Sequence, residues 1–227
     1  MKIVLFGATG MVGQGVLREA LQAPDVEGVL SVGRAPTGLS HPRLREFVHR
    51  DFTDFSGVES ELAGFDACFW CLGVSAAGLS EAEYRRVTYD FTLAAANVLA
   101  RLNPAMTFVY VSGAGTDGTG KGSIMWARVK GETENALLRL PFRAACMFRP
   151  AFIRPAHGER SKTASYRLLY AATGWLITIL RRVAPRYVTT TEEVARAMFH
   201  VAREGAAQRV LENPDIVRYG VSPTRSS

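Results

Sequence analysis

One segment near the amino terminus constrains the fold of this chain more than any other, Gly7-Ala8-Thr9-Gly10-Met11-Val12-Gly13. It follows an apolar run at residues 2–6 and opens a helical pattern over residues 11–21. A strand, a glycine-rich turn and a helix begin a βαβ unit, which builds parallel sheets. Glycines let backbone N–H groups approach a pyrophosphate, whose charge the helix N-terminus also favours. We therefore predict a dinucleotide site in this turn, formed by Gly7, Thr9, Gly10, Met11, Val12 and Gly13.

The rest of the chain alternates between apolar runs and helical patterns. Five further runs have the length and composition of strands: residues 29–32, 47–49, 67–72, 107–111 and 144–148. The clearest helical patterns cover residues 81–102 and 124–138. This alternation predicts an α/β fold, a Rossmann-type doubly wound parallel sheet covered on both faces, with a small C-terminal lobe on the substrate side. We expect a single domain over residues 1–227, with residues 154–190 as a helical segment on the substrate side.

The last third of the chain changes character after Pro150. Thr190 and Glu193 have the spacing of a capping box, which predicts a helix over residues 194–204. Residues 208–212 are expected to add an edge strand, and the tail SPTRSS to fray.

An apolar helix is predicted over residues 166–183, and arginines flank its central run. The run, residues 168–180, is too short to cross a bilayer. Three roles stay open for this helix: a buried roof over a substrate cleft, a homodimer face, or contact with an anionic membrane surface.

The net charge of +6 falls on this part of the chain. Residues 154–186 hold seven basic side chains and one acid, whereas residues 1–150 are balanced. If the apolar helix roofs a cleft, the arginines favour an anionic small-molecule substrate, such as a phosphorylated or nucleotide-linked compound. Nucleic acid is not expected as a partner, because no stripe of basic and aromatic residues is evident.

Composition favours a cytoplasmic protein. The chain enters a strand without a charged and apolar leader, and no run reaches the roughly 18 to 20 apolar residues of a membrane span. Three cysteines are too few for a disulfide framework. Cys68 and Cys71 lie three apart in an expected strand, so their side chains point to opposite faces. The four histidines are scattered, and no metal site is predicted.

The second expected strand ends at Val32-Gly33-Arg34, about 20 residues beyond the glycine turn, where NAD-binding chains usually carry an acid. An arginine suits a 2′-phosphate, so NADP(H) is predicted in preference to NAD(H). Asp51-Phe52 follows the third expected strand. We expect the carboxylate to accept from the adenine amine and the ring to pack beside the base.

These motifs, with Cys71-Leu72-Gly73-Val74, Tyr110-Val111-Ser112 and VKGETE in order, resemble the short-chain dehydrogenase/reductase superfamily. The likeness is to its atypical branch of NmrA-like and Tat-interacting-protein-like NAD(P)-binding proteins, often labelled nucleoside-diphosphate-sugar epimerases. It covers about residues 1–155. The resemblance adds Leu72, Gly73 and Val74 to the predicted cofactor site, and Pro150 and Phe152 in a loop beside the nicotinamide.

The resemblance also implies a catalytic set of Ser, Tyr and Lys. Ser112 matches the serine that binds the substrate oxygen, and Lys130 matches the lysine that holds the nicotinamide ribose. Trp126 falls on the tyrosine position, and its indole N–H donates a hydrogen bond without exchanging a proton near neutral pH. Tyr84 and Tyr89 are more typical of packing residues. The glycine-rich loop at residues 113–122 is expected to be mobile, as a lid over the cleft or as a slack surface loop.

Two functions follow from these residues. One is an NADP(H)-dependent oxidoreductase or epimerase-like enzyme, whose proton comes from water or another side chain. The other is a catalytically silent protein that senses NADP(H) and acts through a protein partner. Trp126 favours the second function, whereas Ser112 and Lys130 are consistent with the first.

Overall fold

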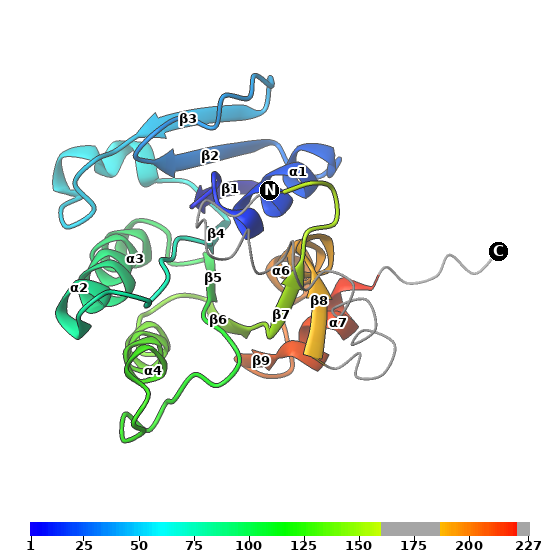
Figure 1. Ribbon diagram of the computed structural model, residues 1–227. Coiled ribbons are helices and arrows are strands. Elements are labelled where there is room, and N and C mark those ends of the chain that lie inside the picture. The colour runs from blue at the N-terminus through cyan, green and yellow to red at the C-terminus, as the bar shows by residue number, and fades with distance from the viewer. Residues whose placement is uncertain (160–186, 222–227) are drawn as a thin grey trace.

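Seven strands form one parallel sheet in the computed structural model, which describes residues 1–159 and 187–221 (Figure 1). In sheet order they are β3 (Leu44–Val48), β2 (Gly28–Gly33), β1 (Lys2–Phe6), β4 (Ala67–Trp70), β5 (Thr107–Val111), β6 (Ala144–Arg149) and β9 (Val210–Glu212). The strand order reverses between β1 and β4, and doubly wound sheets bind ligands at such a switch point. The predicted Rossmann-type parallel sheet is confirmed.

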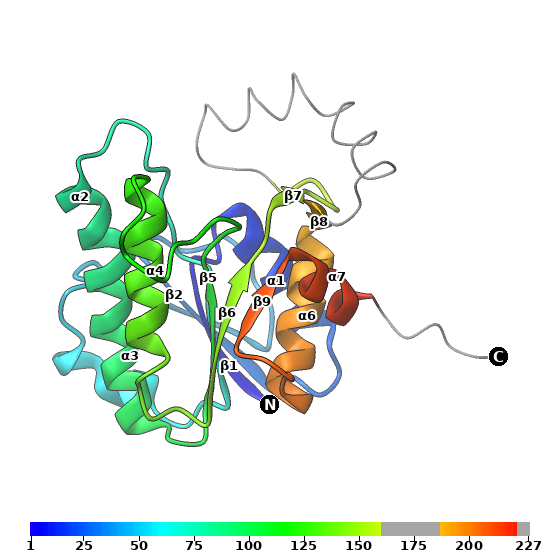
Figure 2. The same ribbon diagram turned by 90° about the horizontal axis from the view of Figure 1, so that it is seen from below.

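Helices cover both faces of this sheet (Figure 2). On one face lie α1 (Met11–Gln22), α6 (Thr191–Glu204) and α7 (Asn213–Gly220). On the other lie η1 (Ser56–Leu62), α2 (Glu81–Arg85), η2 (Arg86–Asp90), α3 (Phe91–Leu102) and α4 (Met125–Leu137). The helix predicted over residues 81–102 is therefore interrupted, because its middle segment η2 is a π-helical turn.

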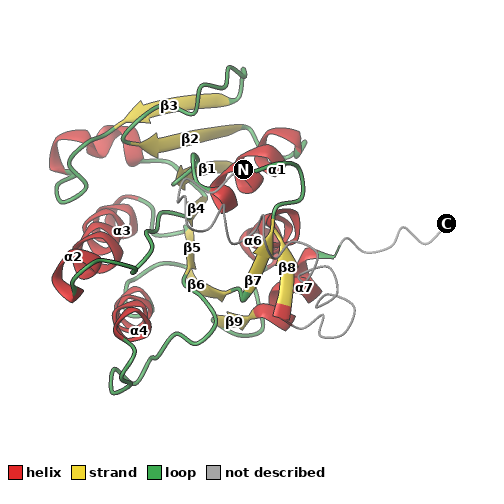
Figure 3. Ribbon diagram, viewed as in Figure 1, coloured by secondary structure: helices red, strands yellow, loops and turns green. Residues whose placement is uncertain are grey.

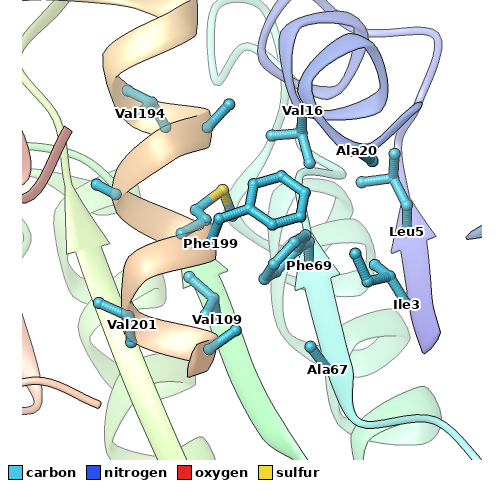
Figure 4. Close-up of a cluster of buried hydrophobic side chains, with 14 of the residues drawn as sticks. Ile3, Leu5, Val16, Ala20, Ala67, Phe69, Val109, Val194, Phe199 and Val201 are labelled. Carbon is cyan, nitrogen blue, oxygen red and sulfur yellow. The ribbon is translucent and has the colours of Figure 1, made fainter. Parts of the chain in front are cut away.

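The central strands β1, β4 and β5 are mostly apolar because both faces of the sheet are buried there. In β1, Ile3 and Leu5 enter the core beneath α1 and α6, while Val4 and Phe6 enter the core beneath α3. In the first of these cores the ring of Phe69 meets the ring of Phe199 edge to face, with centroids 5.2 Å apart (Figure 4). This contact joins β4 to α6, which come from distant parts of the sequence.

Strand β4 ends two residues earlier than expected, at Trp70. Its cysteine pair behaves as predicted: Cys68 is buried in one core and Cys71 packs against the other, and both are free. Burial raises the pKa of both thiols. Within residues 1–159 and 187–221, no cluster of three His, Cys, Asp or Glu side chains is arranged to hold a metal ion.

A second, two-stranded sheet was not predicted from the sequence. It pairs β7 (Phe152–Arg154) with β8 (Val188–Thr190), and the two strands lie side by side in Figure 3. Helix α6 follows β8 directly and begins three residues earlier than expected. The predicted capping box is confirmed, since Thr190 Oγ1 accepts from Glu193 N at 3.0 Å and Glu193 Oε2 from Thr190 N at 2.8 Å.

The predicted edge strand is confirmed as β9, which pairs with β6. The predicted apolar helix over residues 166–183 and the tail SPTRSS lie outside the described residues, as does most of the segment expected over residues 154–190. In the part of the chain that is described, no helix has both the length and the apolar character needed to cross a membrane.

Replacing Phe199 by alanine should test the core contact in Figure 4. We expect Phe199→Ala to lower the free energy of unfolding by about 3 to 5 kcal/mol, because it removes a buried ring and leaves a cavity. Urea denaturation measures this change. Leu39→Ala, at a side chain that is 56% exposed, is the control and should change stability by less than about 0.5 kcal/mol. Equal effects of the two variants would contradict the assignment of Phe199 to the core.

Candidate functional site

The glycine turn closes because two of its positions have no space for a side chain. Gly7 has a φ of +81°, and a Cβ there would lie 2.7 Å from the carbonyl group of Cys71 and the nitrogen of Leu72. A Cβ on Gly13 would lie 2.1 Å from the carbonyl oxygen of Gly7. At Gly10 the nearest atom to such a Cβ is that same oxygen, at 3.3 Å. The turn therefore brings bare backbone and the N-terminus of α1 together, an arrangement that fits a pyrophosphate.

The other residues predicted for the cofactor follow neighbouring strands at the same edge of the sheet. Arg34 follows β2 and is exposed, and Gly73 and Val74 follow β4 and are exposed too. Asp51 is also exposed, and its carboxylate accepts from Thr53 Oγ1 at 2.5 Å and Thr53 N at 2.9 Å. These hydrogen bonds lower the pKa of Asp51 and keep it ionised.

Phe52 requires a correction. Its ring is 2% exposed and lies in the core, with its centroid 6.2 Å from that of Phe6 and 5.8 Å from those of Phe55 and Phe91. An apolar ring gains more from burial against three other rings than from an exposed position. The expected packing of this ring beside an adenine is therefore wrong.

A cleft of about 580 Å³ opens at the carboxyl ends of β5 and β6. It brings together residues that lie far apart in the sequence. Six of the residues predicted for the site line it: Val74, Ser112, Trp126, Lys130, Pro150 and Phe152. The catalytic set and the predicted nicotinamide loop thus meet in one place, whereas the glycine turn and Arg34 belong to the neighbouring strands β1 and β2.

Ser112 follows β5 and is 6% exposed. Its hydroxyl donates to Glu134 Oε1 at 2.5 Å, and the carbonyl oxygen of Phe148 lies 3.0 Å away. Glu134 is 2% exposed and is paired with Arg149, which donates through Nε at 3.0 Å and Nη2 at 2.5 Å. Arg149 also donates through Nη1 to Glu212, at 3.1 Å. Ser112 is thereby tied to a buried ion pair.

The importance of Glu134 and Arg149 was not recognised from the sequence. Because Glu134 lies four residues after Lys130 on α4, its spacing alone would fit a surface ion pair with that lysine. In the structure its carboxylate instead binds Arg149 and Ser112. One sequence feature could have indicated this pair. Glu134 lies on the mostly apolar, buried side of α4, and Arg149 is the last residue of the strand β6.

Lys130 is partly buried, and its ammonium donates to the backbone carbonyl of Ser112. Burial lowers the pKa of Lys130 to about 8, although the nearby negative charge of Glu134 acts in the opposite direction. The ammonium therefore lies beside Ser112 in the predicted site. Its pKa of about 8 is only slightly above neutral pH.

Trp126 lies in the first turn of α4, covered in part by the loop at residues 113–122. A Cβ on Gly115 would lie 3.7 Å from the far edge of its indole. The loop is neither slack nor detached. Asp117 N donates to the carbonyl of Ala127 at 3.0 Å, Asn135 Nδ2 to that of Gly118 at 2.8 Å, and a Cβ on Gly131 would meet the carbonyl oxygen of Asp117 at 1.8 Å. At Asp117 and Gly118 the loop is therefore folded onto α4.

Three tyrosines lie near the site, and their surroundings differ. Tyr84 is buried and also lines the cleft, so it combines a packing role with access to the site. The ring of Tyr89 lies beneath the guanidinium of Arg85, with 4.3 Å between the guanidinium carbon and the ring centroid. Tyr110 is buried in β5, and its burial raises the pKa of the phenol.

With this geometry in place, comparison with known proteins assigns the class. Residues 3–135 match the model of the NAD dependent epimerase/dehydratase family, and this chain belongs to that family of NAD(P)-binding proteins. The fold agrees with that of solved structures. The Bordetella bronchiseptica enzyme WbmF in complex with NAD+ superposes with a TM-score of 0.68 at 14% identity, over 96% of this chain and 76% of that one. A Burkholderia thailandensis oxidoreductase of the short-chain dehydrogenase/reductase family gives 0.67 at 15% identity, over 95% and 92%.

The chain is also similar in sequence to fungal proteins. The chain is 27% identical over 221 residues to protein fmp52-2, mitochondrial, of Aspergillus oryzae, with 95% of both chains covered. It is 28% identical over 232 residues to protein fmp-52, mitochondrial, of Neurospora crassa, over 95% of this chain and 93% of that one. Because these relatives are mitochondrial proteins, the expectation of a cytoplasmic protein is contradicted.

The lowered pKa of Lys130 makes stability depend on pH in a definite direction. Below about pH 8 the folded and unfolded states both hold this proton, and the desolvated ammonium destabilises the fold by a constant amount. Between about 8 and the ordinary pKa of 10.5 the folded state loses the proton first, so the destabilisation is relieved. We expect the free energy of unfolding of wild type to rise across this window relative to that of Lys130→Met, as measured by urea denaturation.

The matched control for this experiment is Lys121→Met, at an exposed loop lysine. It should show no comparable change over the same window. A constant difference between wild type and Lys130→Met from pH 7 to 10.5 would contradict the lowered pKa.

Proposed function

We propose that this chain is an NADP(H)-binding protein of oxidoreductase type, in which Trp126 takes the place of the family's catalytic tyrosine. The observation that carries the proposal is the meeting of Ser112, Trp126 and Lys130 in one cleft, at the sheet edge that also bears the glycine turn. We place the chain in the atypical branch with NmrA-like and Tat-interacting-protein-like proteins, and treat residues 1–227 as a single domain.

In this proposal, different residues of the chain bind different parts of the cofactor. The glycine turn holds the pyrophosphate, Arg34 pairs with the 2′-phosphate, and Asp51 accepts from the adenine amine. Lys130 binds the nicotinamide ribose, and Leu72, Gly73, Pro150 and Phe152 flank the nicotinamide. When bound, the cofactor supplies or accepts the reducing equivalents.

Proton transfer is the step that this site handles differently. An indole N–H can orient a substrate oxygen but cannot give up its proton near neutral pH. Turnover therefore needs a proton from water or from another side chain in the cleft. Tyr84 is the tyrosine that supports such a role best, because it lines the same cleft.

A catalytically silent sensor of NADP(H) is the second candidate function. Two observations favour it: Trp126 replaces the proton-transferring residue, and the hydroxyl of Ser112 donates to Glu134 within the protein. A sensor would act through a protein partner, as a homodimer, or by contact with a membrane surface.

The first test concerns the 2′-phosphate. We expect Arg34→Ala to weaken NADPH binding by about tenfold or more while leaving NADH binding unchanged, because a charge-assisted hydrogen bond is lost only for NADPH. Isothermal titration calorimetry measures both affinities. Arg139→Ala is the control, since Arg139 follows α4 at the opposite edge of the sheet. Equal affinity of wild type for NADPH and NADH would overturn the assignment of Arg34.

The second test concerns turnover. Wild type and Trp126→Tyr are each given NADPH with a panel of carbonyl compounds and nucleotide sugars, and NADPH absorbance is followed. If the missing tyrosine limits the chemistry, Trp126→Tyr should raise the rate by at least about a hundredfold, the usual contribution of a general acid. Turnover by wild type at a rate that the variant does not improve would exclude the silent sensor.

A further inference from the structure

Pro150 and Ala151 connect β6 of the main sheet to β7 of the small sheet, and both line the cleft. Two backbone groups in this connection are held by other parts of the chain. The carbonyl oxygen of Pro150 accepts from Ala114 N at 2.9 Å, and Ala151 N donates to the side-chain oxygen Oδ1 of Asn213 at 3.0 Å. Asn213 is 62 positions further along the chain, so the second hydrogen bond joins a wall of the cleft to the C-terminal part of the fold.

Asn213 reaches this connection because of the strand that precedes it. β9 lies beside β6 and leads directly into α7, whose first residue is Asn213 (Figure 2). The register places Glu212 opposite Arg149, so β9 and β6 end at the same level. Asn213 therefore follows its strand at the sheet edge where the cleft opens. It is 3% exposed, and a buried amide costs free energy unless it is hydrogen-bonded, a need that Ala151 N meets in part.

Other residues stabilise the start of the helix that Asn213 begins. Glu212 and Asp215 form a capping box, in which Glu212 N donates to Asp215 Oδ2 at 3.2 Å. Pro214, in the first turn, has the fixed φ that suits a helix start. The oxygen Oδ1 of Asn213, by contrast, accepts from a different segment, at Ala151. This hydrogen bond therefore stabilises the cleft wall more directly than it stabilises α7.

We infer that Asn213 is a positioning residue for the nicotinamide half of the cofactor. By accepting from Ala151 N, it fixes the stretch of the cleft wall that contains Pro150 and Phe152. This role rests on the proposed function, in which those two residues flank the nicotinamide. The glycine turn, which follows β1, is separated from β6 by β4 and β5. Loss of the hydrogen bond should therefore weaken the binding of the nicotinamide half and leave that of the adenine half unchanged.

Two ligands separate these halves: NADPH, and 2′,5′-ADP, which has the adenosine and the 2′-phosphate but no nicotinamide. Isothermal titration calorimetry on the full chain gives both dissociation constants. We expect Asn213→Leu, which removes the acceptor but keeps a side chain of similar size, to weaken NADPH binding by about fivefold, the effect of losing one hydrogen bond. Binding of 2′,5′-ADP should change by less than about twofold. Asn213→Asp keeps an acceptor oxygen and should bind both ligands as wild type does.

Asn103→Leu is the matched control. Asn103 is 5% exposed and also holds backbone groups of another segment, since its Oδ1 accepts from Phe65 N at 2.9 Å and its Nδ2 donates to the carbonyl oxygen of Leu62 at 2.8 Å. It precedes β5, at the edge of the sheet opposite the cleft. We expect this variant to be less stable than wild type, with the ratio of the two dissociation constants unchanged.

An unchanged ratio in Asn213→Leu would overturn the role of Asn213, as would the same shift of the ratio in Asn103→Leu. If Asn213→Leu does not fold, hydrogen exchange of the Ala151 amide in wild type, followed by NMR, decides instead. Saturating NADPH should slow this exchange by about fivefold relative to saturating 2′,5′-ADP, because only NADPH carries the half that rests on this stretch. Equal exchange rates would overturn the role as well.

These measurements also separate this role from the proposed function. Failure of wild type to bind either ligand would overturn the proposed function, and the role of Asn213 with it. Tight binding of NADPH by wild type, with the same affinity in Asn213→Leu, would overturn the role of Asn213 alone.

Discussion

The buried ion pair between Glu134 and Arg149 is the interaction on which the candidate site depends. A carboxylate of 2% exposure is stable only when it is paired and hydrogen-bonded, because its desolvation costs several kcal/mol. Its partners come from the carboxyl ends of two neighbouring strands, Ser112 after β5 and Arg149 at the end of β6. Arg149 continues the network to Glu212 of β9. The pair therefore fixes α4, with Trp126 and Lys130, against the sheet edge where the cleft opens.

The parts of the fold that depend on local sequence were predicted well. Residues 107–111 have the predicted bounds as β5, and the strand, turn and helix at the amino terminus follow the glycine spacing. The errors arise where distant contacts decide. Strand β4 stops at Trp70 because the next residues turn against Gly7, and β7 was missed because its partner β8 lies more than 30 residues further along. No local periodicity reports such a pairing.

The same distinction holds within the site. The candidate catalytic residues were identified through the family resemblance, and they do line one cleft. Phe52 was assigned to the cofactor because sequence position shows only that a ring is near the sheet edge, and the packing of Phe6, Phe55 and Phe91 decides where it points. Glu134 was overlooked for the opposite reason. Helical periodicity identifies a face, but it does not reveal that a charged group on that face is buried with a partner from another strand.

Membership of the family does not by itself settle what the cleft does, because function resides in the site rather than in the fold. The cofactor half of this chain depends on backbone geometry, and the glycine turn has that geometry. The half that we propose to handle the substrate depends on where single protons lie. Trp126 offers a proton that it cannot release, and Ser112 directs its own proton to Glu134. In the function that we propose, cofactor binding and turnover therefore rest on separate physical grounds, and the first can persist when the second has been lost.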